Sequence, residues 1–414
     1  MTDVAREFLA MALAFGFLIF VPQGKIWKGF TLFFTGLIMG GAAGLAPTKL
    51  WSNFQAVVLT PSTVKTMAVI VQIGIFSALM KHYGLLSSIY RGLKYIFPSS
   101  RAVMMLLPAA IGMVSVPGGA AISSPFVDEI GASLRLPPGK RAAVNLTFRH
   151  IAYFLLPTSS SMILLSDLAS GMNLYRLIAL NVPFIFLMEL SSYGLYLSGV
   201  ATPRDEARRD VRLGVLHMLK YFSPVYAVVA LNAFFGVEMY LSVFLSLMLI
   251  LACWGRRDPK TYWKVFWKGL KVETFVLMAG IYYLQNTVNS LPAVMRAFQT
   301  LFHGASGFSV LLVIAASALF FGLTAGLSFV SLGVLVPLLT GLRLPQEQEM
   351  LYGVFIYTWS FIGYFFSPLH LCLVLTLRQM GCSMRSLYRS YMPLMAEMAV
   401  SSFLIFYLYR AFLL

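Results

Sequence analysis

The chain has 414 residues, of which 59% are hydrophobic and only 11% are charged. This composition excludes an ordinary soluble domain, in which about a quarter of the residues are charged. The formal net charge of +16 is dispersed among short loops, so we interpret it as a signal of membrane topology and not of nucleic-acid binding. We therefore expect an all-α, multi-pass protein of the cell (inner or cytoplasmic) membrane.

Apolar stretches of roughly 20 residues, the length that crosses a bilayer, recur along the whole chain. The first lacks the basic start and the small-residue cleavage site of a signal peptide, so we expect it to remain as a helix. Ten spanning helices are predicted, near residues 4–22, 27–45, 60–82, 142–169, 173–200, 214–236, 238–254, 269–291, 350–378 and 388–412.

Two further apolar segments, 101–131 and 305–342, are interrupted in the middle by Gly, Ser and Pro. Unpaired backbone groups at membrane depth are tolerated only where protein encloses them or where they line a watered cavity. We predict that both segments are re-entrant hairpins, which enter and leave the membrane on one side. Most Lys and Arg then fall on one face, which the positive-inside rule makes cytoplasmic, so both termini are predicted to be external.

An internal repeat supports this layout. The motif "LRLP" occurs at 134 and again at 342, and "IAYFLLP" at 151 is echoed by "IGYFFSP" at 362. We divide the chain into a first repeat (1–200), a cytoplasmic linker (201–212) and a second repeat (213–414), each with five spans and one hairpin. Five crossings invert one repeat relative to the other, and inverted repeats with broken helices are typical of secondary transporters.

The interrupted segments carry the candidate binding residues. The hairpin tips read "PGGAAISSP" (117–125) and "TAGLSFVSLG" (324–333), and the spans after them break at "LLPTSSSM" and "FFSPLHLC". Their glycines let backbone approach a ligand, their hydroxyls supply polar contacts, and half-helix ends suit ions. The alternative is that these motifs only allow kinks and close packing. Predicted substrate-binding residues are Gly118, Gly119, Ser123, Ser124, Arg149, Thr158, Ser159, Ser160, Gly326, Ser328, Ser331, Ser367 and His370, with a Na⁺ site near Ser123, Ser159, Ser328 and Ser367.

Several ionisable residues fall inside predicted spans, where charge is costly and usually functional. Arg149 is predicted to anchor an anion, although a snorkelling side chain that reaches the headgroups is the alternative. His150, Glu189 and Glu397 are candidates for proton coupling. A packing histidine and structural hydrogen bonds of the two glutamates are the competing interpretations.

The three cysteines, Cys253, Cys372 and Cys382, show no CxxC or Cys/His metal spacing, so we expect reduced packing residues and no metal other than Na⁺. No protease-type Ser/His pair, HExxH motif or paired-Asp motif was found, which argues against an intramembrane enzyme.

At the tips and breaks the sequence resembles the ion transporter superfamily, and most closely an uncharacterised, gluconate-permease-like prokaryotic integral membrane family. The resemblance implies paired hairpin tips and broken helices that hold substrate and Na⁺, and it implies a homodimer. The chain departs from the usual Ser-Asn-Thr triplets, because its first tip has Gly-Gly-Ala and Ser-Ser and neither tip has Asn.

The sequence therefore predicts a secondary active transporter of a small organic anion, coupled to Na⁺ or H⁺ and working by alternating access. The alternative is a translocase of a lipid-linked anion such as a polyisoprenyl phosphate. No cofactor is expected beyond a coupling ion, and the expected partners are the anion and membrane lipid.

Overall fold

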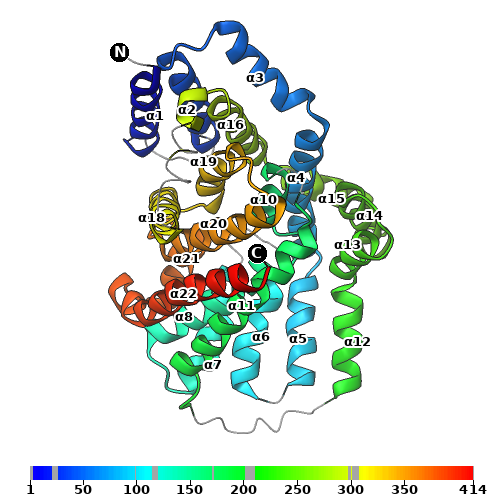
Figure 1. Cartoon of the computed structure of the whole chain (residues 1–414). Helices are drawn as coiled ribbons and strands as arrows, with labels where there is room; N and C mark the ends of the chain where they lie inside the picture. Colours follow the sequence, from blue (N-terminus) through cyan, green and yellow to red (C-terminus); the bar gives the residue numbers. More distant parts are fainter. Residues whose placement is uncertain are drawn as a thin grey trace.

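The computed structural model describes residues 3–20, 27–97, 99–113, 120–169, 172–200, 210–296, 300 and 307–413. These residues form helices and no strand, as predicted (Figure 1). The first half contains α1 (Asp3–Phe20), α2 (Trp27–Ala42), α3 (Pro47–Leu59), α4 (Pro61–His82), α5 (Leu85–Ile96), α6 (Ser100–Gly112), α7 (Ala120–Ser133), α8 (Pro138–Arg149), α9 (Ile151–Leu155), α10 (Ser160–Leu168) and α11 (Leu174–Tyr196).

The second half has the same helical character. It contains α12 (Val211–Tyr221), α13 (Ser223–Ala233), α14 (Met239–Ile250), the π-helical turn η1 (Leu251–Gly255), α15 (Pro259–Gly269), α16 (Val272–Val288), α18 (Gly307–Ala325), α19 (Ser328–Gly341), α20 (Gln346–Phe366), α21 (Leu371–Met380) and α22 (Met384–Leu413).

Six helical stretches in the described part of the chain are long and apolar enough to cross a membrane. The prediction of a multi-pass membrane protein is thereby confirmed, although the ten predicted spans exceed this number. Two of the predicted spans are shorter apolar helices, Gly29–Ala42 and Met239–Gly255. The six are Pro61–His82, Pro138–Leu168, Leu174–Tyr196, Gly307–Ala325, Gln346–Met380 and Met384–Phe412.

The predicted span 214–236 is a bent pair instead of one straight helix. Helices α12 and α13 meet at an angle of 62°, and Pro224 stands in the first turn of α13. Proline lacks an N–H donor and its ring crowds the preceding turn, so α12 ends before it. Counted as one span, this pair would be the seventh in the described residues.

Helices α3, α5 and α15 lie outside the predicted spans and hairpins. Helix α5 buries Leu85, Ile89 and Leu93 on one face and leaves Arg91 exposed on the other. Such an amphipathic pattern packs against protein on one side only. Helix α5 lies beside α12 (Figure 1), where an added Cβ at Gly214 would be 2.8 Å from the Gly92 carbonyl oxygen.

Two helical pairs occupy the segments that were predicted as hairpins. Helix α6 packs against α7 and α8, and α18 packs against α19 and α20. An added Cβ at Gly112 would lie 2.0 Å from the Arg149 carbonyl oxygen, and one at Gly322 would lie 2.7 Å from the Tyr364 amide nitrogen. In each pair, a glycine therefore lies against the backbone of the following long helix. A larger residue at either position would force the two helices apart.

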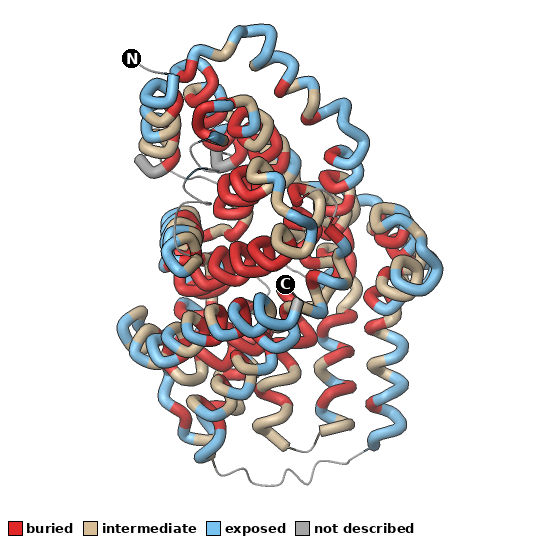
Figure 2. Tube along the Cα trace, viewed as in Figure 1, coloured by how far each residue is buried: buried red, intermediate tan, exposed pale blue. Residues whose placement is uncertain are grey.

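Helix α20 is the most deeply placed long helix, buried along most of its length (Figure 2). Its large side chains, including Tyr357, Phe361 and Phe365, are fully buried in the main hydrophobic cluster. A helix that is apolar all round belongs in a core. Helices α18, α19 and α22 pack around α20, which fixes the position of the break at its end.

Candidate functional site

Both long helices break at the predicted prolines. In the first half the helix is interrupted after α9 and resumes at Ser160, and in the second half it stops at Phe366 and resumes at Leu371. The residue before each proline is extended, with ψ 133° at Leu156 and ψ 132° at Ser367. This is the conformation that a following proline ring imposes, so the two breaks have one local cause.

A cavity of about 360 Å³ lies where the two breaks meet α4, α6, α16 and the α18–α19 turn. This volume suits a small molecule. The cavity is lined by Ile70, Ile73, Gly74, Gly112, Arg149, His150, Tyr153, Ser159, Ser160, Ser161, Lys271, Thr274, Leu277, Gly326, Leu327, Ser328, Phe329, Tyr364, His370, Leu371 and Cys372.

Seven residues predicted from the sequence line this one cavity, although they come from both halves of the chain. Arg149 and His370 are nearly completely buried, at 6% and 1% exposure. Convergence of such distant residues is expected of a binding site between two repeats. The seven are Arg149, His150, Ser159, Ser160, Gly326, Ser328 and His370.

Other predicted residues lie elsewhere. Ser331 and Ser367 each donate a hydrogen bond to a backbone carbonyl, of Ala318 at 3.0 Å and of Leu323 at 2.6 Å. Thr158 faces a separate small gap against α13 and α14. Ser123 and Ser124 are buried in α7 and do not line the cavity, while Gly118 and Gly119 lie outside the described residues.

Glu189 and Glu397 do not line the cavity either. They are half-buried on α11 and α22, which pack against each other. One carboxylate oxygen of each has no hydrogen-bond partner in the described part of the chain. Both carboxylates are therefore set apart from the residues that could hold a substrate.

Three helices begin at the cavity, so that their first residues line it. These are α10 at Ser160, α19 at Ser328 and α21 at Leu371, all of which are cavity-lining residues. The first amides of a helix have no partner within it, and the helix dipole is positive at this end. Three such ends around one space form a ready site for an anion.

The turn between α18 and α19 is tied to both breaks. The hydroxyl oxygens of Ser161 and Ser328 are 2.9 Å apart, and Gly326 has φ +60°. An added Cβ at Gly326 would be 2.8 Å from Leu369 Cβ. Glycine is needed here both for the left-handed backbone and for the close approach to the second break.

Sequence reasoning missed several cavity-lining residues. Tyr153 and Ser161 sit next to predicted positions, but Lys271 was interpreted only as loop charge and Cys372 only as packing. The spacing His370-x-Cys372 was too short to suggest a site until the fold brought His150 beside it. Asp167, which lies on α10 outside the cavity lining, was also missed; it accepts a hydrogen bond of 2.5 Å from the Tyr282 hydroxyl.

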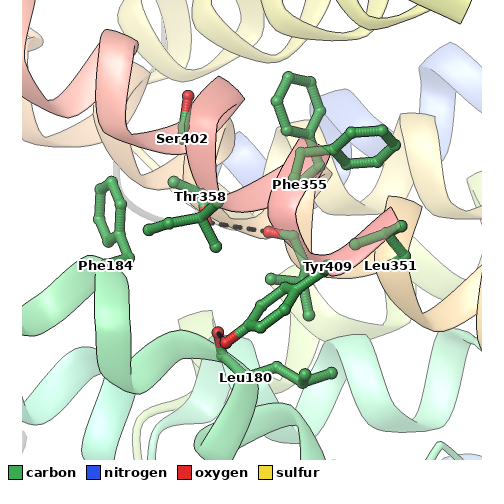
Figure 3. A pocket seen from close by; sticks show the side chains of 10 residues that line it. Leu180, Phe184, Leu351, Phe355, Thr358, Ser402 and Tyr409 are labelled. Carbon is green, nitrogen blue, oxygen red and sulfur yellow. Dashed lines mark hydrogen bonds between the residues drawn. The ribbon is translucent and has the colours of Figure 1, made fainter. Parts of the chain in front are cut away.

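A smaller gap between α11, α20 and α22 is shown in Figure 3. It measures only about 10 Å³ and is lined mainly by apolar side chains such as Phe184 and Phe355. Its hydroxyl groups are already used, since Thr358 donates to the Val354 carbonyl and Tyr409 to the Leu180 carbonyl. This gap is a packing feature with little room for a ligand.

The fold and the cavity define a multi-pass helical membrane protein with a cavity at two helix breaks, lined by basic, hydroxyl and apolar side chains. The chain belongs to the family described as "Protein of unknown function (DUF401)", which it matches over residues 43–409. No curated protein matches it.

Proposed function

We propose that the protein is a secondary active transporter of a small organic anion, coupled to Na⁺ or H⁺. The observation that carries the proposal is the convergence of three helix N-termini and the buried Arg149 on one cavity. Positive helix ends that face a substrate from broken helices are the arrangement by which transporters hold anions near the membrane midplane.

The charge of the lining supports an anion and not a cation as substrate. Arg149 and Lys271 are basic, and no Asp or Glu is among the described residues that line the cavity. Two basic groups without a carboxylate leave a positive potential that an anion would neutralise. The planar guanidinium of Arg149 also offers two parallel N–H donors, which match a carboxylate or phosphate.

A coupling cation needs an acidic or oxygen-rich site, and Asp167 provides one on α10, about two helical turns from the cavity-lining Ser160. The Tyr282 hydroxyl donates a hydrogen bond to Asp167. Asp167 and Tyr282 lie on α10 and α16, two helices that also line the cavity. We propose Asp167 as the group that binds H⁺ or Na⁺, in preference to Glu189 and Glu397.

The proposed mechanism is alternating access, in which two inverted repeats carry re-entrant hairpins and both termini are external. In support, Gly112 and Gly322, 210 residues apart, make the equivalent close approach of each helical pair to the following long helix. The sequence repeats have similar offsets, 208 residues for "LRLP" and 211 residues for the motifs at 151 and 362. We also propose membership of the ion transporter superfamily and a homodimer, both on the resemblance of the tips and breaks.

The second candidate function, translocation of a lipid-linked anion, is favoured by one observation. Leu371 lines the cavity and yet is 47% exposed, and nearby Leu369 is 55% exposed. Exposed leucines beside the cavity would allow a lipid tail to remain in the bilayer while its phosphate reaches the basic residues of the cavity.

The test uses purified protein in proteoliposomes loaded to provide a Na⁺ or H⁺ gradient. Uptake of radiolabelled carboxylates that collapses when the gradient is dissipated supports coupled transport. Gradient-independent movement of a fluorescent polyisoprenyl phosphate between leaflets, without uptake of any soluble anion, supports the lipid translocase. A thermal-shift screen selects the anions, because a ligand that binds only the folded state raises its apparent stability.

A further inference from the structure

His150, His370 and Cys372 form a buried cluster in the wall of the central cavity. One potential ligand atom from each lies within 4.8 Å of the others, and the side chains are only 6%, 1% and 8% exposed. The two imidazole rings are 5.0 Å apart between centroids and inclined at 71°. His150 closes α8, while His370 and Cys372 flank the first residue of α21.

Both imidazoles are fixed in one tautomer by the backbone. His150 Nδ1 lies 2.6 Å from the Leu146 carbonyl oxygen, and His370 Nδ1 lies 3.3 Å from that of Phe365. A carbonyl oxygen can only accept, so each Nδ1 carries the proton and each Nε2 presents a lone pair. His370 Nε2 is buried without a hydrogen-bond partner in the described part of the chain, which is costly unless a ligand satisfies it.

We propose that His150, His370 and Cys372 bind a borderline to soft transition-metal ion, of which Zn²⁺ is the type. Two imidazoles and a thiolate are the donors that such ions prefer over oxygen ligands. Metal-bound histidines usually donate their other ring N–H to a carbonyl or carboxylate, as both histidines do here. Three protein ligands leave a fourth coordination position, which faces the cavity.

The cluster needs only a small closure to reach metal-ligand geometry. Zinc lies about 2.0–2.1 Å from imidazole nitrogen and about 2.3 Å from thiolate sulfur. The ligand atoms must therefore move inward by roughly an ångström, which small side-chain rotations allow. The neighbouring Tyr364 hydroxyl, 3.5 Å from His150 Nε2, would shift to a ligand-bound water or anion.

The charges around the cluster favour the form of Cys372 that binds metal. Arg149 lines the same cavity as Cys372, and Cys372 is the second residue of α21, next to the helix N-terminus. A cation and a helix N-terminus both stabilise a thiolate, and metal binding requires the thiolate. With a divalent ion the site remains positive, so we expect an anion such as hydroxide or chloride at the fourth position.

The test is a Co²⁺ titration of the full-length protein in detergent, without any transported substrate. We expect one Co²⁺ per chain, a thiolate-to-cobalt charge-transfer band and displacement by Zn²⁺. Cys372→Ser should abolish the band, whereas Cys253→Ser and Cys382→Ser should retain it. His370→Gln should weaken Co²⁺ binding by about a hundredfold or more, beyond the tenfold to hundredfold loss typical of a missing supporting hydrogen bond.

Two results would overturn the metal site. One is a wild-type protein that gives no charge-transfer band, and the other is a band that survives Cys372→Ser. Thermal unfolding of each variant shows whether it is folded. If Cys372→Ser is unstable, His370→Gln, which keeps a polar side chain at its position, serves as the test variant instead. Since no transport is measured, failure of the metal site and failure of the proposed transport function are separate outcomes.

Discussion

Ser161 and Ser328 lie with their hydroxyl oxygens 2.9 Å apart, although 167 positions separate them in the chain. Ser161 lies in the first turn of α10 and Ser328 is the first residue of α19, so this contact joins the two halves at the cavity. Buried hydroxyl pairs of this kind in membrane proteins contribute about 0.6 kcal/mol on average, up to about 1.7 kcal/mol.

A double-mutant cycle of Ser161→Ala and Ser328→Ala measures this contact. We expect a coupling energy of about 0.5–1.5 kcal/mol in the free energy of unfolding, because each single change leaves the other hydroxyl without its partner. The control pair is Ser161→Ala with Ser331→Ala, since Ser331 donates to the Ala318 carbonyl instead. Equal coupling in the two cycles would contradict a direct contact.

Arg149 should distinguish an anion anchor from a snorkelling side chain. Arg149→Lys should keep folding but weaken anion binding, and Arg149→Met should abolish it. A charge-assisted contact of about 1.5–3 kcal/mol corresponds to about a tenfold to hundredfold loss of affinity. The measurement is ligand-induced thermal shift and transport, with exposed Arg212 changed to Met as the control. Wild-type affinity in Arg149→Lys would remove the main support for an anionic substrate.

Gly112 should be one of the least replaceable glycines. A Cβ there would meet the Arg149 carbonyl oxygen at 2.0 Å, and overpacking of this kind costs about 1–3 kcal/mol. Gly112→Ala should therefore lower the unfolding temperature. The matched control is Gly194→Ala in α11, where nothing lies within 4 Å; it should be neutral or stabilising by up to about 1 kcal/mol. Similar unfolding temperatures for both variants would argue against the close approach of α6 to α8.

Asp167 should couple transport to the cation gradient. Asp167→Asn keeps a hydrogen-bond acceptor for Tyr282 but cannot hold a proton or balance Na⁺, so exchange of anion should persist while gradient-driven accumulation is lost. Glu189→Gln and Glu397→Gln are the controls and should keep accumulation, because they lie on α11 and α22, which do not line the cavity, whereas Asp167 lies on α10, which does. If Asp167→Asn kept gradient-driven accumulation and Glu189→Gln or Glu397→Gln lost it, the coupling residue would lie on α11 or α22 instead.

Labelling of single cysteines tests the predicted topology. The end of α5 that carries Tyr95 and Ile96 lies beside Gly214 of α12, so we expect exposed Lys94→Cys and Arg212→Cys to react with an impermeant maleimide from the same, cytoplasmic side. The background replaces Cys253, the exposed cysteine. Reaction of the two positions from opposite sides would exclude re-entrant hairpins in the predicted arrangement.

The sequence alone was sufficient for the features that depend on local physics. A composition of 59% hydrophobic residues already required a membrane protein, and Pro157 and Pro368 determined where two long helices stop, because a proline ring acts on its own chain neighbours. Arg149 was identified as unusual because charge inside an apolar stretch is costly wherever that stretch folds.

Only the tertiary structure decided which polar residues meet. Ser331 and Ser367 carry the same hydroxyl as Ser159 and Ser328, yet the first two bond to carbonyls and the last two face the cavity. Cys372 lies close to His150 because α8 and α21 pack against each other, which the sequence does not indicate. Distances between residues more than 200 positions apart follow from packing across the whole bundle, and no local pattern in the chain encodes them.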